Sequence, residues 1–169
     1  AGVARAVVAH YATTAKIDRI LPFRFIAAAR AVPEWEDIIE PMMLRALAER
    51  PVFPGRTILL IDASGSMSSK VSGKSDISRL DAACGVAIFL RELADYIDVF
   101  TFSDDVRRVP PRRGFALRDA IGHPRGGTRL GAAVRAVSDQ GHDRLIVITD
   151  EQSRDAVPNP VRVGYMVNV

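Results

Sequence analysis

Five side chains that carry oxygen atoms stand directly after apolar runs or glycines in this sequence. Three follow the apolar run 57–61 in the pattern Asp-x-Ser-x-Ser, one follows two glycines, and one ends the apolar run 145–149. Two carboxylates and three hydroxyls form a hard oxygen set, which suits Mg²⁺, Mn²⁺ or Ca²⁺ and not zinc or copper. The pattern predicts a divalent-cation site, with loop caps and turns as the alternative. Its residues are Asp62, Ser64, Ser66, Thr128 and Asp150.

Apolar runs alternating with amphipathic stretches must position these side chains. The runs predict strands over 57–61, 97–102, 106–109, 145–149 and 161–169. Three- and four-residue spacing predicts helices over 3–20, 25–31, 42–50, 76–96, 115–121 and 128–137. Strands alternating with helices predict an α/β fold, a doubly wound and mostly parallel sheet flanked by helices. Ligands of such sheets bind outside the carboxyl ends of the strands, where Asp62 and Asp150 meet if their strands are neighbours.

Composition narrows the class of protein. The chain has 169 residues, a formal charge of +3 and 48% hydrophobic residues, as expected for a globular chain. Its single cysteine, Cys84, excludes an internal disulfide framework and a Cys-rich zinc site. No apolar run reaches the ~20 residues of a membrane span, and the N-terminal residues lack a signal-peptide core. We therefore expect a cytoplasmic protein without a membrane partner.

Arginines form two groups of interest. The densest basic cluster is Arg107, Arg108, Arg112 and Arg113. It predicts either phosphate contacts to nucleic acid or a solvated sheet edge. Arg125 and Arg129 flank Thr128, where they would either screen the two carboxylates or hold an acidic group of a partner.

The five-residue pattern resembles the metal-ion-dependent adhesion site of von Willebrand factor A domains, and all five positions match. The resemblance covers residues 55–169 and implies strand order 3-2-1-4-5-6, with Asp62 and Asp150 on neighbouring strands. It also implies a Mg²⁺ ion, or Mn²⁺ or Ca²⁺, that accepts an anionic oxygen from a protein or other acidic ligand. On this comparison the sequence ends before the last strand and helix of an A domain.

Residues 1–54 carry a second resemblance. The run Ile20-Leu21-Pro22-Phe23-Arg24-Phe25, followed by helical sequence and the A domain, is similar to the carboxyl-terminal part of Ro autoantigen-like (TROVE) proteins. Such proteins join a ring of helical repeats to an A domain and bind Y RNAs and misfolded small RNAs. Residues 1–54 would be a helical connector from that ring. The resemblance implies small noncoding RNA as a partner, bound through the part of the ring that this chain lacks.

Two other functions remain open on sequence grounds. One is an A domain of a chelatase or AAA-ATPase partner protein; the run at 21–25 favours the Ro-like interpretation over it. The other is a Mg²⁺-dependent phosphohydrolase with Asp62 as nucleophile. In haloacid-dehalogenase-like phosphatases a second aspartate lies two residues further on, and Ser64 stands at that position here. We therefore expect a binding protein and not an enzyme.

Overall fold

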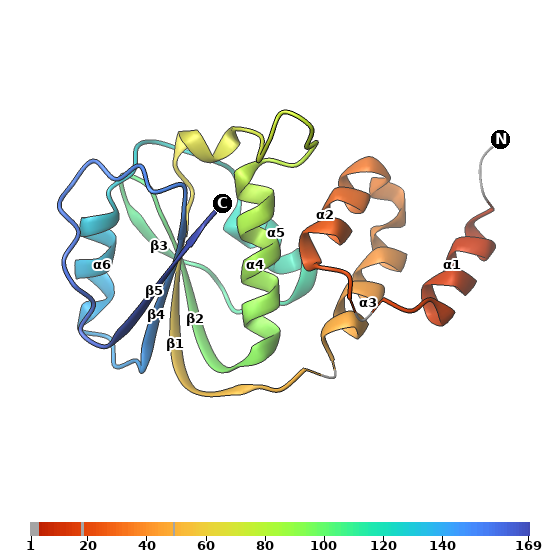
Figure 1. Cartoon of the computed structure of the whole chain (residues 1–169), viewed down its shortest axis with the longest axis horizontal. Helices are drawn as coiled ribbons and strands as arrows, with labels where there is room; N and C mark the ends of the chain where they lie inside the picture. The colour runs from red at the N-terminus through yellow and green to blue at the C-terminus, as the bar shows by residue number, and fades with distance from the viewer. Residues whose placement is uncertain (1–3, 18, 49) are drawn as a thin grey trace.

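A five-stranded sheet forms the centre of the computed structural model, which describes residues 4–17, 19–48 and 50–169 (Figure 1). The strand order is β3-β2-β1-β4-β5, and only the β2–β3 pair is antiparallel. The strands are β1 (Phe53–Asp62), β2 (Ala94–Phe102), β3 (Val106–Arg108), β4 (Arg144–Thr149) and β5 (Val163–Asn168). The predicted α/β fold is confirmed, and so is the neighbouring placement of the strands that precede Asp62 and Asp150.

The sheet is covered on both faces, which explains the continuous apolar run of β1. Leu59 and Ile61 pack on one side with α4 (Arg79–Leu93) and α5 (Gly114–Ile121). Ile58 and Leu60 pack on the other side with α6 (Leu130–Ser138) (Figure 1). Because side chains alternate along a strand, a strand between two helical layers must be apolar at every position.

Three N-terminal helices extend the layer on the α4 side. They are α1 (Arg5–Thr14), α2 (Pro22–Ala31) and α3 (Glu36–Leu47), with the 3₁₀ helix η1 (Pro33–Trp35) between the last two. Ile26 of α2 and Met43 of α3 are fully buried in the same core as Leu59. The helix α2 approaches α4 at Gly85, where an added Cβ would lie 2.9 Å from the backbone nitrogen of Phe23. The division of the chain at residue 54 stays a prediction.

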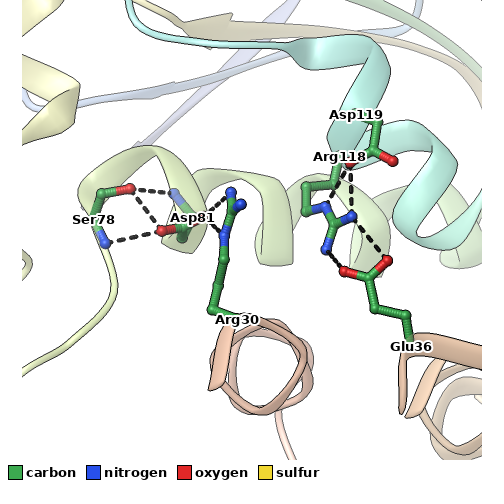
Figure 2. A network of polar contacts seen from close by, with 6 residues as sticks. All are labelled: Arg30, Glu36, Ser78, Asp81, Arg118 and Asp119. Atoms are coloured by element: carbon green, nitrogen blue, oxygen red, sulfur yellow. Dashed lines mark hydrogen bonds and ion pairs between the residues drawn. The ribbon is translucent and has the colours of Figure 1, made fainter. Parts of the chain in front are cut away.

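Ion pairs also connect the N-terminal helices to the helices on the sheet (Figure 2). Arg30 of α2 donates two hydrogen bonds to one oxygen of Asp81 in α4, at 2.9 and 3.2 Å. The Arg118 guanidinium of α5, only 8% exposed, pairs with Glu36 of α3 at 2.7 Å and with its neighbour Asp119. The N-terminal helices are thus attached by both apolar and charged contacts.

Several element boundaries differ from the predicted ones. The helix predicted over 76–96 is α4, which begins only after the capping residue Ser78 and ends where β2 starts at Ala94. The helix predicted over 42–50 begins earlier than expected: α3 starts at Glu36 and contains Pro41 in its interior. η1 leads directly into α3, so the helix is already formed before the proline and loses only the one hydrogen bond that proline cannot donate.

The ends of the N-terminal segment differ as well. The helix predicted over 3–20 is observed as α1, while residues 3 and 18 lie outside the described residues. The strand β1 begins at Phe53, inside the Pro/Gly-rich stretch 51–55 that predicts a linker. Throughout the described part of the chain, no helix combines the length and apolar character needed to cross a membrane.

Candidate metal centre

Asp62 is the last residue of β1 and is fully buried. Its Oδ1 accepts a hydrogen bond from the Ser64 backbone N–H at 2.8 Å, and its Oδ2 accepts one from the Thr149 hydroxyl at 2.6 Å. The first bond shapes the loop after β1, and the second crosses to the end of the neighbouring strand β4. The carboxylate is therefore fixed by two elements at the carboxyl edge of the sheet.

The two serines lie at the start of the short 3₁₀ helix η2 (Gly65–Ser68). Ser64 is buried, Ser66 is half-buried, and their Oγ atoms are 3.1 Å apart. Two backbone hydrogen bonds join this loop to the glycine loop before α6: Gly65 N–H to the Gly126 carbonyl at 3.1 Å, and Arg125 N–H to the Ala63 carbonyl at 2.6 Å. The loops that carry Ser64, Ser66 and Thr128 are thus held side by side.

Thr128 lies at the end of the glycine loop, two residues before α6 and not within it as predicted. Gly126 has a φ of +57°, a left-handed conformation that favours glycine, and Asp104 accepts a hydrogen bond from Gly127 N–H at 2.9 Å. Thr128 is 5% exposed, and its hydroxyl has no hydrogen-bond partner among the residues that the structure describes. This hydroxyl is therefore available to a ligand.

The segment after β4 closes over the same loop. The Arg154 N–H donates to the Thr128 carbonyl at 2.9 Å. Asp155 accepts hydrogen bonds from Gly131 and Ala132 in the first turn of α6, at 2.9 and 2.8 Å. Burial by itself would raise the pKa of Asp155, but these backbone hydrogen bonds and one from Ser153 outweigh it and lower the pKa. The start of α6 is thereby fixed by a negative charge, which a helix N-terminus favours.

Asp150 directly follows β4, and its side chain is only 2% exposed. Its Oδ2 lies 2.9 Å from Nη1 of Arg79, the first residue of α4. The next residue, Glu151, has a φ of +64°, an uncommon conformation for a residue other than glycine. Such backbone strain typically occurs where the surrounding structure enforces it, often at functional sites.

Sequence reasoning missed two residues of this arrangement, Thr149 and Arg79. The sequence predicts that Thr149 ends the strand before Asp150. Its hydrogen bond to Asp62 depends on strand order and register, which the sequence pattern does not give. Arg79 is 71 residues from Asp150 in sequence, and no pattern connects the two. Only the packing of α4 against the sheet brings them together.

The side-chain chemistry fits a hard divalent cation. Asp62 and Asp150 come from neighbouring strands, and the serine and threonine hydroxyls come from the two loops joined beside Asp62. Across residues 4–17, 19–48 and 50–169, no group of three or more His, Cys, Asp or Glu side chains could hold a metal ion. A cation bound here would therefore depend on hydroxyl oxygens as well as the two carboxylates. The presence of the metal stays a prediction.

The basic cluster predicted for nucleic acid is largely neutralised by neighbouring carboxylates. Arg107 and Arg108 lie in β3 at the sheet edge, while Arg112 and Arg113 precede α5. Arg112 is exposed and has no ion-pair partner within the described part of the chain. The other three arginines form ion pairs: Arg107 with Asp105, Arg108 with Asp98, and Arg113 with Glu92.

The two arginines that flank Thr128 do not reach the predicted metal ligands. The Arg125 guanidinium donates to the Thr101 hydroxyl at 3.0 Å and lies 3.4 Å from Asp105. Arg129 is exposed, and its backbone N–H donates to the Ser103 carbonyl. Among the described contacts neither arginine pairs with Asp62 or Asp150. The arginine that contacts Asp150 is Arg79, and both roles expected of Arg125 and Arg129 stay predictions.

Comparison with known proteins places this site in a wider context. The family model of the von Willebrand factor type A domain matches residues 57–152. The crystal structure of the Ro (RSR) protein of Deinococcus radiodurans is similar over 95% of this chain and 44% of that one, with a TM-score of 0.64 and 17% identity. At that identity the likeness shows the fold, and this chain spans less than half of that protein's length.

A second solved structure is similar over a smaller share of the chain. It is an aerotolerance-related membrane protein of Bacteroides fragilis carrying multiple mutations to serine, with 20% identity and a TM-score of 0.48. The similarity covers 60% of this chain and 56% of that one. No curated protein matches the sequence at a significant level.

Proposed function

The chain belongs to the von Willebrand factor type A domain family, and on that premise we propose that its polar cluster is a metal-ion-dependent adhesion site. The single observation that carries the proposal is the placement of two buried carboxylates at the ends of neighbouring strands, beside two hydrogen-bonded loops that carry the three hydroxyls. Mg²⁺ is the expected ion, with Mn²⁺ or Ca²⁺ as substitutes. The proposed ligands are Asp62, Ser64, Ser66, Thr128 and Asp150.

The proposed chemistry is recognition of an anion. Two carboxylates balance the charge of a divalent cation, and neutral hydroxyls add no further negative charge. An ion held in this way retains affinity for one more anionic oxygen, which a protein or other acidic ligand would supply. The protein side chains fix the ion, and the ion in turn makes the contact with the partner.

We further propose that the site binds its ligand without converting it. Catalytic hydrolysis of a phosphate ester on Asp62 would need an acid beside it to protonate the leaving group. The residue two positions further on is Ser64, whose Oγ contacts Ser66.

Thermal unfolding with and without metal tests the proposed site. Mg²⁺ or Mn²⁺ at ten times its Kd should stabilise the wild-type protein by about 1.4 kcal/mol, because the ion binds only the folded chain. A gain of this size raises the Tm of a protein of this length by roughly 3–6 °C. The Asp62→Asn variant keeps the shape of the buried side chain and should lose the shift.

Asp143→Asn is the matched control for that experiment. Asp143 also accepts a hydrogen bond from a backbone N–H, that of Arg56 at 2.7 Å. It directly precedes β4, whereas Asp150 directly follows it, so the two aspartates lie at opposite ends of this strand. This variant should show the wild-type response to metal. No shift in the wild-type protein at millimolar metal, or an equal shift in Asp62→Asn, would contradict the proposal.

We also propose that the chain is the carboxyl-terminal part of a Ro-like RNA-binding protein. The support is the similarity to the Deinococcus radiodurans Ro protein, which extends over 95% of the chain and so includes the N-terminal helices as well as the sheet. Small noncoding RNA would be the partner of the complete protein. In this proposal the principal RNA surface belongs to the ring of helical repeats, and the metal site serves a second, acidic ligand.

A further inference from the structure

Arg79 stands out because it brings a permanent positive charge to a proposed metal ligand. It is the first residue of α4, and its backbone N–H donates to the Ser69 carbonyl at 2.8 Å, which anchors the helix start to the loop after η2. Its Nη1 lies 2.9 Å from Asp150 Oδ2. The Arg79 side chain is 30% exposed and that of Asp150 is 2% exposed.

The two carboxylates of the site are stabilised in different ways. Asp62 accepts hydrogen bonds from two neutral donors, one for each oxygen. Asp150 has one good contact, the ion pair with Arg79, and a long hydrogen bond of 3.4 Å from Gln152 N–H. Among the described residues, Arg79 is the one charged group that contacts either carboxylate. Burial of a carboxylate is costly unless a cation or strong donors face it, so Asp150 depends on Arg79.

We propose that Arg79 sets the affinity of the site for divalent cations by competing with them for Asp150. This inference rests on the proposed metal site and concerns its regulation. A divalent ion that uses Asp150 must share that carboxylate with the guanidinium, and the two positive charges repel each other. Arg79 therefore lowers the affinity for the ion alone. An anionic group of a partner offsets the surplus positive charge, so the ion and its acidic ligand bind best together.

Removal of the Arg79 charge should strengthen metal binding. Arg79→Gln replaces the guanidinium by a shorter, uncharged polar side chain, and we expect its Kd for Mn²⁺ to be about tenfold lower than that of the wild-type protein. The same variant should melt at a lower temperature without added metal, because Asp150 loses its partner. Metal should then raise its Tm by more than it raises the wild-type Tm. Competition therefore predicts that Arg79→Gln has a lower Tm than the wild-type protein without metal and a larger rise in Tm when metal is added.

Two variants separate charge from shape and position. Arg79→Lys keeps the positive charge, and its Kd should stay within about threefold of the wild-type value. Arg30→Gln is the matched control, because Arg30 also forms an ion pair with the first turn of α4, at Asp81 (Figure 2). Among the described contacts, Arg30 pairs with neither Asp62 nor Asp150. The Kd of Arg30→Gln for Mn²⁺ should equal that of the wild-type protein.

A second comparison avoids an unpaired buried carboxylate, should Arg79→Gln fail to fold. Asp150→Asn removes the negative charge and leaves Arg79 facing the site, and the double variant Arg79→Gln/Asp150→Asn removes both charges. The double variant should bind Mn²⁺ more tightly than Asp150→Asn alone. Equal or weaker binding by the double variant would overturn the proposal.

Titration of Mn²⁺, followed by calorimetry and by melting, distinguishes failure of this inference from failure of the proposed function. If the wild-type protein binds Mn²⁺ and Arg79→Gln binds equally or less tightly, Arg79 is a positioning residue and competition is refuted while the metal site stands. If neither protein binds Mn²⁺, the metal site itself is refuted. If Arg79→Gln binds tightly and an added Asp62→Asn change does not weaken that binding, the ion lies elsewhere and the proposal is overturned.

Discussion

Thr149 links the two strand ends that carry the proposed metal ligands. Its hydroxyl donates to Asp62 at the end of β1 and accepts the Glu151 backbone N–H at 3.1 Å. Glu151 is the residue with the left-handed backbone after Asp150. One buried hydroxyl therefore orients one carboxylate and helps to shape the turn that places the other.

Replacement of Thr149 by valine should destabilise the fold at this point. Valine has the same shape but leaves one oxygen of the buried Asp62 without a donor, and such a loss costs about 1–3 kcal/mol. Urea unfolding should show that decrease for Thr149→Val, together with a smaller Tm response to Mg²⁺. Thr149→Ser, which keeps the hydroxyl, is the matched control and should remain closer to wild type in both measurements. Equal losses in the two variants would mean that the methyl group, and not the hydrogen bond, matters here.

At the residue level, short sequence patterns indicate which side chains are close along the chain, but they do not reveal individual contacts between distant residues. Asp62, Ser64 and Ser66 follow one strand within five residues, so their type and spacing indicate a common site. The contact between Arg79 and Asp150 joins the start of a helix to the end of a strand far along the chain. Its formation depends on side-chain length and on the angle at which α4 crosses the sheet, and neither is encoded in a short pattern.

The N-terminus of α4 is the element on which the site and the N-terminal helices converge. Ser78 accepts a hydrogen bond from Asp81 N–H at 3.0 Å, and the Asp81 carboxylate accepts one from Ser78 N–H at 3.1 Å, which makes a capping box (Figure 2). Burial by itself would raise the pKa of Asp81. The hydrogen bonds from Arg30 and Ser78 outweigh that effect, so the pKa of Asp81 is lowered.

This lowered pKa predicts a pH-dependent contribution to stability. A carboxylate whose pKa is lower in the folded state stabilises the protein above its unfolded pKa of about 3.9, and the contribution is lost as the pH falls through the folded value. Wild type should therefore be more stable than Asp81→Asn at pH 6–7, and the difference should shrink below about pH 4. Urea unfolding from pH 3 to 7 measures it. The exposed Asp76→Asn change is the control and should have little effect throughout; a constant difference for Asp81→Asn would contradict the prediction.

The central strands are the elements that the sequence predicts best. Short apolar runs bounded by polar residues, alternating with longer amphipathic stretches, indicate buried strands between helices. β1 and β4 are observed where such runs lie. Helix ends are predicted less well, because they depend on capping contacts such as Ser78 with Asp81. The early start of α3 before Pro41 depends on its continuity with η1, which apolar spacing does not reveal.

At the scale of the whole molecule, the charge distribution limits how tightly this chain can bind RNA. Residues 106–169 hold 11 arginines and 6 acidic residues, 11 − 6 = +5. However, Arg107, Arg108 and Arg113 already pair with nearby carboxylates, which reduces the positive field they present. A phosphate contact by these side chains would compete with the ion pairs that they already form. Arg112 is the member of the cluster best placed to contact phosphate directly.

We therefore expect this chain by itself to bind structured small RNA weakly. Non-specific phosphate contacts typically give a Kd of ~10⁻⁴–10⁻⁶ M and weaken steeply with salt. Filter binding at two salt concentrations should show this behaviour. Arg112→Gln/Arg113→Gln should weaken binding more than Arg5→Gln/Arg30→Gln, which removes the same amount of charge from two ion-paired arginines of the N-terminal helices, outside the basic cluster. EDTA should have no effect, because the proposed metal site accepts a single anionic oxygen and not a run of phosphates. Nanomolar binding that resists salt and disappears with EDTA would instead indicate that RNA binds at the metal site. The proposal that RNA binds mainly to the ring of helical repeats, and a different acidic ligand to the metal site, would then be wrong.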